Sequence, residues 1–131
     1  MKRIILLVSA SLLFVLPVAA QRSGKYVKSG NDKYAQERYD DANTDYRRAL
    51  KQNDKSFEAA FNLGDALFRQ QKYDDAIAQY EAAAANIKDG DKRRRAAVMH
   101  NIGNAYYAQQ QFDKSVEAYK EALTLLSNCC W

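Results

Sequence analysis

The sequence predicts an all-α fold built from three repeated pairs of helices. Within residues 57–87, two stretches carry apolar residues at spacings of three and four, which is the pattern of one buried helix face. A polar turn at residues 70–72 separates them, so the two stretches form a helix pair. Shifting this pair back by 34 residues or forward by 39 brings glycines and aromatic residues into register with those of the pair. The chain therefore contains an internal repeat, with six helices in three pairs.

Small residues recur where the two helices of each pair would cross. One place in each first helix is held by glycine: Gly30, Gly64 and Gly103. The matching place in each second helix is held by a small residue: Ala42, Ala76 and Ser115. Small side chains let two helices approach closely, and aromatic residues can fill the space around the contact. We expect the aromatic positions of each second helix to do so.

A 34-residue period of paired helices with this arrangement of small and aromatic residues resembles the tetratricopeptide repeat (TPR). The resemblance implies an α-solenoid, a right-handed superhelix of six helices, with repeats at about 23–56, 57–90 and 96–128. An insertion at residues 88–92 lengthens the last step, and Asp89, Gly90 and Asp91 can turn the chain there. Residues 21–26 are expected to be loose. Polar Ser29 and Lys33 fit a solvent-facing first repeat.

The first twenty residues have the pattern of a secretory signal peptide. Lys2 and Arg3 precede an apolar run, and Val18, Ala19 and Ala20 form a small-residue cleavage site. The prediction is an exported, periplasmic chain with a signal peptide at 1–20 and a TPR domain at 21–131, cleaved before Gln21. The alternative is a retained membrane anchor, since the apolar run is long enough to enter a bilayer.

Charge and motifs argue against several function classes. Without Lys2 and Arg3, 18 basic residues face 16 acidic ones, a net charge of +2 in place of +4, so no nucleic-acid partner is expected. The basic run at 92–95 is either a solvated helix start or a docking patch for an acidic partner or an anionic lipid surface. The single histidine, His100, stands in no catalytic motif. We predict no enzyme activity, no cofactor and no metal.

The TPR resemblance implies that the first helix of each pair lines a concave groove that binds a protein partner. Aromatic side chains there would grip apolar residues of the partner, and amides would bond its extended backbone. The predicted groove residues are Asn31, Tyr34, Phe61, Asn62, Asp65, Phe68, Arg69, His100, Asn101, Asn104 and Tyr107.

The alternative for the aromatic residues is core packing, and for Asn62 and Asn101 it is local satisfaction within a helix. TPR proteins that clamp a C-terminal carboxylate carry cations at positions where this chain has Val27, Ala97 and Asn101. A carboxylate clamp is therefore not expected.

Two phrases of the sequence carry a closer resemblance. The segments at 61–84 (FNLGDALFRQQKYDDAIAQYEAAA) and 100–123 (HNIGNAYYAQQQFDKSVEAYKEAL), behind a signal peptide, resemble the BatC family of periplasmic TPR proteins of the Bacteroides aerotolerance operon. That resemblance implies a non-catalytic adaptor in an envelope complex with membrane-bound von Willebrand factor A domain proteins, linked to oxidative-stress survival. The alternatives are a periplasmic chaperone that holds extended clients and a self-associating structural protein.

The last predicted helix carries an apolar stripe with no following helix to cover it. The stripe consists of Val116, Tyr119, Leu123 and Leu126. Either the sequence is truncated or altered at its end, or the stripe is exposed and favours a homo-oligomer. The alternative to an exposed stripe is that Trp131 folds back over it. The adjacent cysteines at 129 and 130 are too close for an unstrained mutual disulfide, so free thiols or an intermolecular bridge are expected.

Overall fold

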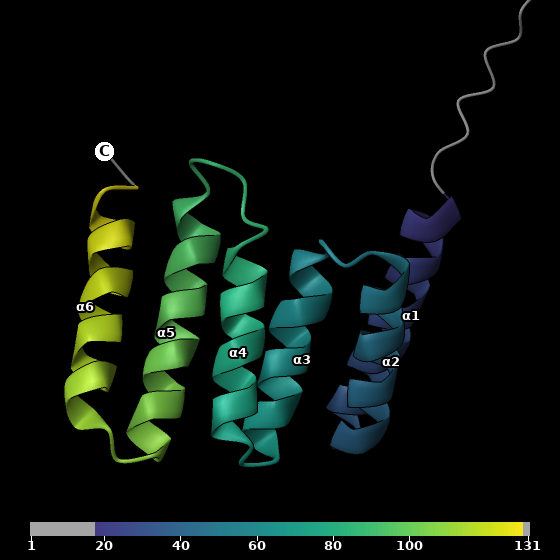
Figure 1. Ribbon diagram of the computed structural model, residues 1–131, viewed down its shortest axis with the longest axis horizontal. Coiled ribbons are helices and arrows are strands. Elements are labelled where there is room, and N and C mark those ends of the chain that lie inside the picture. The colour runs from purple at the N-terminus through teal and green to yellow at the C-terminus, as the bar shows by residue number, and fades with distance from the viewer. Residues whose placement is uncertain (1–17, 130–131) are drawn as a thin grey trace, which may run out of the picture.

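The computed structural model describes residues 18–129, and within this range the secondary structure is six α-helices. The helices are α1 (Val18–Ala35), α2 (Tyr39–Gln52), α3 (Phe57–Arg69), α4 (Tyr73–Ala84), α5 (Lys92–Ala108) and α6 (Phe112–Ser127). They stand in one row in chain order, as three antiparallel pairs, so that α1 and α6 lie at opposite ends (Figure 1). The predicted all-α solenoid of three helix pairs is confirmed.

The start of the first repeat differs from the prediction. Residues 21–26 are helical, because α1 already begins at Val18. Ser23 is 3% exposed, and its hydroxyl donates to the carbonyl of Ala49 in α2 at 3.1 Å. This contact ties the first turns of α1 to the end of α2, so the expectation of a loose segment was wrong.

The two helices of each pair are joined by the same tight turn. Its central residue adopts a left-handed conformation in all three pairs: Glu37 (φ 59°), Gln71 (φ 59°) and Gln110 (φ 61°). In the second pair the Lys72 N–H donates to the Leu67 carbonyl at 3.0 Å, which is the long bond of a Schellman-type helix end. An edge-to-face aromatic pair spans each turn: Tyr34–Tyr39, Phe68–Tyr73 and Tyr107–Phe112.

The repeated glycines make room for a tyrosine ring. A Cβ atom built on Gly64 would lie 2.6 Å from Cε1 of Tyr80 in α4. The same relation holds between Gly30 and Tyr46 at 2.5 Å and between Gly103 and Tyr119 at 2.6 Å. The predicted close approach is present, and the group that fills it is the aromatic ring of the second helix.

The connection between the second and third pairs contains the predicted turn. Gly90 has φ 87°, which favours glycine, and the Asp91 side chain caps α5 by accepting from the Arg94 N–H at 3.0 Å. Arg94 also reaches back to Glu58 at 2.8 Å and lies over the Phe57 ring at 4.8 Å. Part of the basic run at 92–95 therefore links α5 to α3.

The N-terminal end of the row is closed by a buried carboxylate. Asp45 in α2 is 2% exposed and accepts from the Ser29 hydroxyl at 2.6 Å, while Lys33 and Arg48 pair with it. Burial alone would raise the pKa of Asp45, but the hydrogen bonds from Lys33 and Ser29 and the two positive charges hold it below its usual range. The polar residues of α1 thus form a satisfied end to the solenoid.

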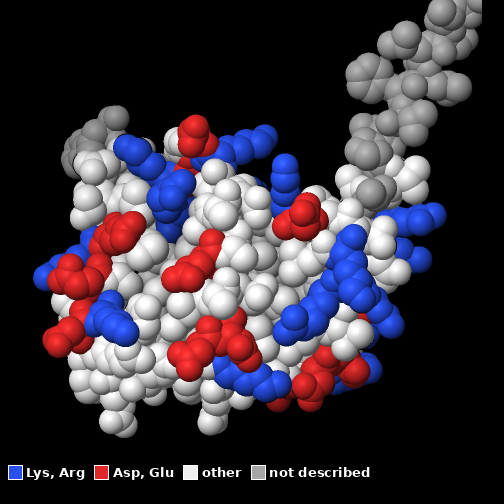
Figure 2. Space-filling view, viewed as in Figure 1, with Lys and Arg blue, Asp and Glu red and all other residues white. Residues whose placement is uncertain are grey.

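Basic and acidic side chains are intermingled on the face seen in Figure 2. None of the six helices in the described range is long and apolar enough to cross a bilayer. Cys129 is a half-buried free thiol. The signal-peptide prediction for residues 1–17 and the prediction for Cys130 lie outside the described residues.

Candidate functional site

The first helices of the three pairs form a continuous surface, because α3 contacts α1 on one side and α5 on the other. All eleven predicted groove residues lie on these three helices. Their side chains fall into two groups. The side chains of one group lie together along the row of repeats, and those of the other contact the core or the turns between helices.

A row of hydrogen bonds links the repeats, and we call it the polar ladder. In each repeat a tyrosine hydroxyl donates to Oδ1 of a first-helix residue: Tyr46 to Asn31 at 2.8 Å, Tyr80 to Asp65 at 2.7 Å and Tyr119 to Asn104 at 2.6 Å. The next repeat adds a second donor to the same oxygen: Asn62 to Asn31 at 2.8 Å and Asn101 to Asp65 at 2.9 Å. The ladder therefore joins neighbouring repeats through one shared acceptor per junction.

Asp65 is the only carboxylate of the polar ladder. Burial raises its pKa, and the hydrogen bonds from Tyr80 and Asn101 offset this shift only in part. Burial and the Asp65 carboxylate together raise the pKa of Tyr80 far above its usual range, so this phenol keeps its proton. The arrangement suits a fixed donor and acceptor pair.

Two hollows lie along the ladder. One of about 250 Å³ is lined by Asn31, Tyr34, Tyr46, Asn62 and Asp65. A smaller one of about 80 Å³ is lined by Tyr34, Asp65, Phe68, Tyr80, Asn101 and Asn104. The structure thus brings seven of the eleven predicted residues together. Asn62 and Asn101 each use one amide hydrogen in the ladder, which leaves a second one per amide to face a ligand.

The other four predicted residues make different contacts. Phe61 packs between Phe57 and Tyr80, and Arg69 lies over the Tyr39 ring at 5.4 Å. His100 lies against Tyr119 at the far end of the row. Tyr107 is 62% exposed and rests against the aromatic partner across its turn. That these eleven residues contact a partner protein stays a prediction.

Sequence reasoning missed a second set of bonds between repeats. Gln70 donates to Asp40 at 2.8 Å, and Gln109 donates to Asp74 at 2.6 Å. The signal was present in the sequence, because glutamine recurs at 36, 70 and 109 in the same place of each repeat.

No group of histidine, cysteine and acidic side chains within residues 18–129 is arranged to hold a metal ion. The predicted groove residues offer aromatic rings, amides and one carboxylate, that of Asp65, in an open row. Such a row is suited to contact an extended polypeptide.

Comparison with known families decides the identity of the repeat. Two family models described as tetratricopeptide repeat match the chain, one at residues 27–91 and the other at residues 96–129. The chain belongs to the tetratricopeptide-repeat family. The predicted TPR fold is confirmed, and proteins of this fold are typically non-enzymatic scaffolds for protein–protein interactions.

Solved TPR structures superpose on most of the chain. The N-terminal domain of stress-induced protein-1 from C. elegans has a TM-score of 0.76 at 19% identity and covers 82% of this chain and 86% of its own. The TPR domain of Arabidopsis FLU has a TM-score of 0.76 at 22% identity, covering 84% and 98%.

The first TPR of Spaghetti (RPAP3), solved with an HSP90 peptide, has a TM-score of 0.73 at 22% identity, covering 83% and 82%. At these identities the similarity shows the fold alone. A comparison with curated proteins finds no match.

Proposed function

We propose that the chain is a non-catalytic TPR adaptor that binds an extended segment of a partner protein along the polar ladder. The observation that carries the proposal is the alternation of amide groups with aromatic rings around the two hollows beside Asp65. A solved TPR neighbour holds a peptide, which supports this class of ligand.

The chemistry of the hollows indicates how such a segment would bind. The spare amide hydrogens of Asn62 and Asn101 can donate to backbone carbonyls, and each net hydrogen bond contributes about 0.5–1.5 kcal/mol. Tyr34 and Phe68 are half-buried and offer apolar contact beside these amides. A segment with small apolar side chains between exposed backbone carbonyls fits this pattern.

We further propose that the adaptor is exported and acts in an envelope complex. The signal-peptide pattern at residues 1–20 supports export. The BatC-like phrases support a periplasmic role in aerotolerance with a membrane-bound von Willebrand factor A domain partner. N-terminal sequencing of the native protein tests export: a start at Gln21 supports it, and an intact Met1 in the membrane fraction contradicts it.

Binding is tested with a paired variant of the ladder. Asn62→Ala with Asn101→Ala should weaken partner binding measured by calorimetry by roughly tenfold, because two donors are lost. The control is Arg47→Ala with Glu81→Ala, two exposed changes on second helices, which should bind as the wild type does. Equal affinity of the ladder variant would place the site elsewhere.

Two alternatives are separated by what the protein retains from envelope extracts. An adaptor returns a few stoichiometric partners, whereas a chaperone returns a broad set of clients. A structural protein that self-associates through α6 returns mainly itself. The exposed apolar residues of α6 are the observation that keeps this last alternative in view.

A further inference from the structure

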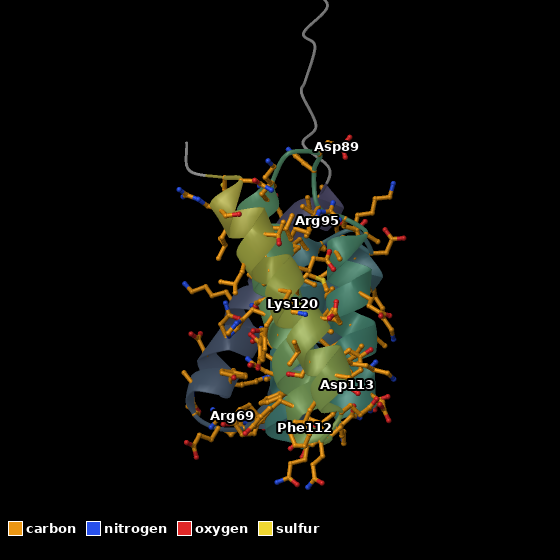
Figure 3. All side chains as sticks on the ribbon, turned by 90° about the vertical axis from the view of Figure 1, so that its left-hand side faces the viewer. Arg69, Asp89, Arg95, Phe112, Asp113 and Lys120 are labelled. Carbon is orange, nitrogen blue, oxygen red and sulfur yellow. The ribbon has the colours of Figure 1, made fainter. Side chains whose placement is uncertain are left out.

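The outer face of α6 is the end of the row opposite the buried carboxylate, and it is apolar. Val116 is 48%, Leu123 67% and Leu126 46% exposed. In the second repeat the residues that match Val116 and Leu126 are buried, with Ile77 at 8% and Ile87 at 7% exposed, and Ala84, which matches Leu123, is half-buried. Figure 3 looks onto this end, with α6 in front and Asp113 and Lys120 labelled along it. We call this surface the end face.

Each internal junction of the row is closed by the same two donors. At the junction of the first two repeats, Asn62 donates to Asn31 and Gln70 donates to Asp40. At the next junction, Asn101 donates to Asp65 and Gln109 donates to Asp74. In both cases the glutamine is the first residue after the helix and lies eight residues beyond the asparagine. Apolar residues lie between them: Leu63 and Leu67 in α3, and Ile102 and Tyr106 in α5.

The end face carries the two matching acceptors without those donors. Asn104 corresponds to Asn31 and Asp65, and Asp113 corresponds to Asp40 and Asp74. Among residues 18–129, Asn104 Oδ1 accepts the Tyr119 hydroxyl and no amide, and Asp113 is exposed and takes no glutamine. A groove of about 600 Å³ lies between α5 and α6, toward the C-terminal end of α6, and its walls include Ala97, His100, Leu123 and Leu126.

We propose that the end face binds an amphipathic helix of a partner protein that has the chemistry of a first TPR helix. The helix carries an amide donor for Asn104, a second one eight residues later for Asp113, and apolar residues between them that cover Val116 and Leu123. This surface meets the polar ladder at Asn104, which also lines the smaller hollow. Asp113, Val116 and Leu123 line neither hollow, so changes at these three residues test the end face without altering the proposed groove.

A second copy of the chain fits the end face less well. Its α1 has donors at the right spacing, Lys28 and Gln36, but Ser29 and Lys33 stand where the internal junctions have apolar residues. Lys33 is also held by the buried Asp45. Pairing of two α6 helices would cover the stripe, but α6 contains neither asparagine nor glutamine to reach Asn104. A helix from another protein is the better match.

The chain itself supplies a probe for this site. A labelled peptide of residues 55–72 contains Asn62, Leu63, Leu67 and Gln70. A lactam between Asp65 and a Phe61→Lys side chain of the peptide holds it helical on the side away from these residues. Fluorescence anisotropy with the purified full chain should show saturable binding.

Leu123→Glu should weaken peptide binding at least tenfold, because the charge would be buried beneath the peptide. The control Ala82→Glu, an exposed position on α4, should leave binding unchanged. Asp113→Ala in the chain and Gln70→Ala in the peptide should each weaken binding by roughly threefold to tenfold. Combined, they should cost no more than either alone, since they remove the same hydrogen bond.

Three results would overturn the proposal. One is equal binding to the Leu123→Glu chain, and another is no saturation up to about 1 mM peptide, the weak limit of specific recognition. The third is a dimer in light scattering that Leu123→Glu converts to a monomer, because a second copy would then be the occupant of the end face.

Discussion

Replacing Gly64 with alanine tests how closely α3 and α4 pack. The added Cβ would lie 2.6 Å from Cε1 and 2.7 Å from Cδ1 of Tyr80, closer than carbon atoms approach in a relaxed core. The ring has little room to retreat, because Tyr80 is 2% exposed and its hydroxyl is bound to Asp65 at 2.7 Å. The methyl group must separate the two helices or break that hydrogen bond.

The magnitude follows from two opposed effects. Extra bulk in a filled core costs about 1–3 kcal/mol, and alanine is a better helix former than glycine by about 1 kcal/mol. Because two ring atoms are contacted at once, we expect the packing cost to win. Gly64→Ala should lower the free energy of unfolding by about 1–2 kcal/mol, which corresponds to roughly 4–10 °C in melting temperature.

Urea denaturation followed by far-UV circular dichroism measures this change. The control is Gly24→Ala in α1, where an added Cβ meets nothing within 4 Å and helix propensity alone should raise stability by up to about 1 kcal/mol. In a Tyr80→Leu background the clash is removed, so Gly64→Ala should no longer destabilise. Wild-type stability of Gly64→Ala in the normal background would refute the close contact.

Two further predictions concern single side chains. Gln71→Gly should raise the free energy of unfolding by about 0.5–1 kcal/mol in urea melts, because φ 59° is unfavourable for a residue with a Cβ, and a lower value would show that the turn tolerates it. Because folding raises the pKa of Asp65, protonation of its carboxyl stabilises the folded state. This contribution is complete below the unfolded pKa of about 3.9 and is lost as pH rises through the pKa of the folded state. Asp65→Asn keeps an acceptor for Tyr80 and should flatten that part of the stability–pH profile; an unchanged profile would assign it to another group.

The repeat pattern was sufficient to predict the fold. Glycine and aromatic residues recur at matching places in all three repeats. Each such glycine needs a partner helix close by, so the helix pairs and the turns between them followed from the sequence alone. Three of the four residues of the predicted stripe on α6, Val116, Leu123 and Leu126, are exposed, whereas Tyr119 is half-buried because its ring fills the space beside Gly103. The start of α1 was missed, because the bond from Ser23 to Ala49 depends on how two helices align and leaves no periodic signal.

The groove was predicted as a face and not as a set of bonds. Periodicity indicates which side of a helix Asn62 occupies, but the partner of its amide is Asn31, in a different repeat. Such a contact depends on the offset between α1 and α3, which the period does not determine. The recurrence of glutamine likewise marks the place of Gln70, but its bond to Asp40 depends on the offset between α2 and α3.

The two candidate surfaces differ in how cleanly they can be tested. Asn62 and Asn101 both hold neighbouring repeats together, so removing either amide weakens the junction as well as any ligand contact. Loss of binding in that variant is evidence for the groove only when its melting temperature is compared with that of the control. Leu123 is 67% exposed, so its replacement by a charged residue changes the end face with little effect on the core. A binding defect in Leu123→Glu can therefore be read directly as the loss of a contact with the partner helix.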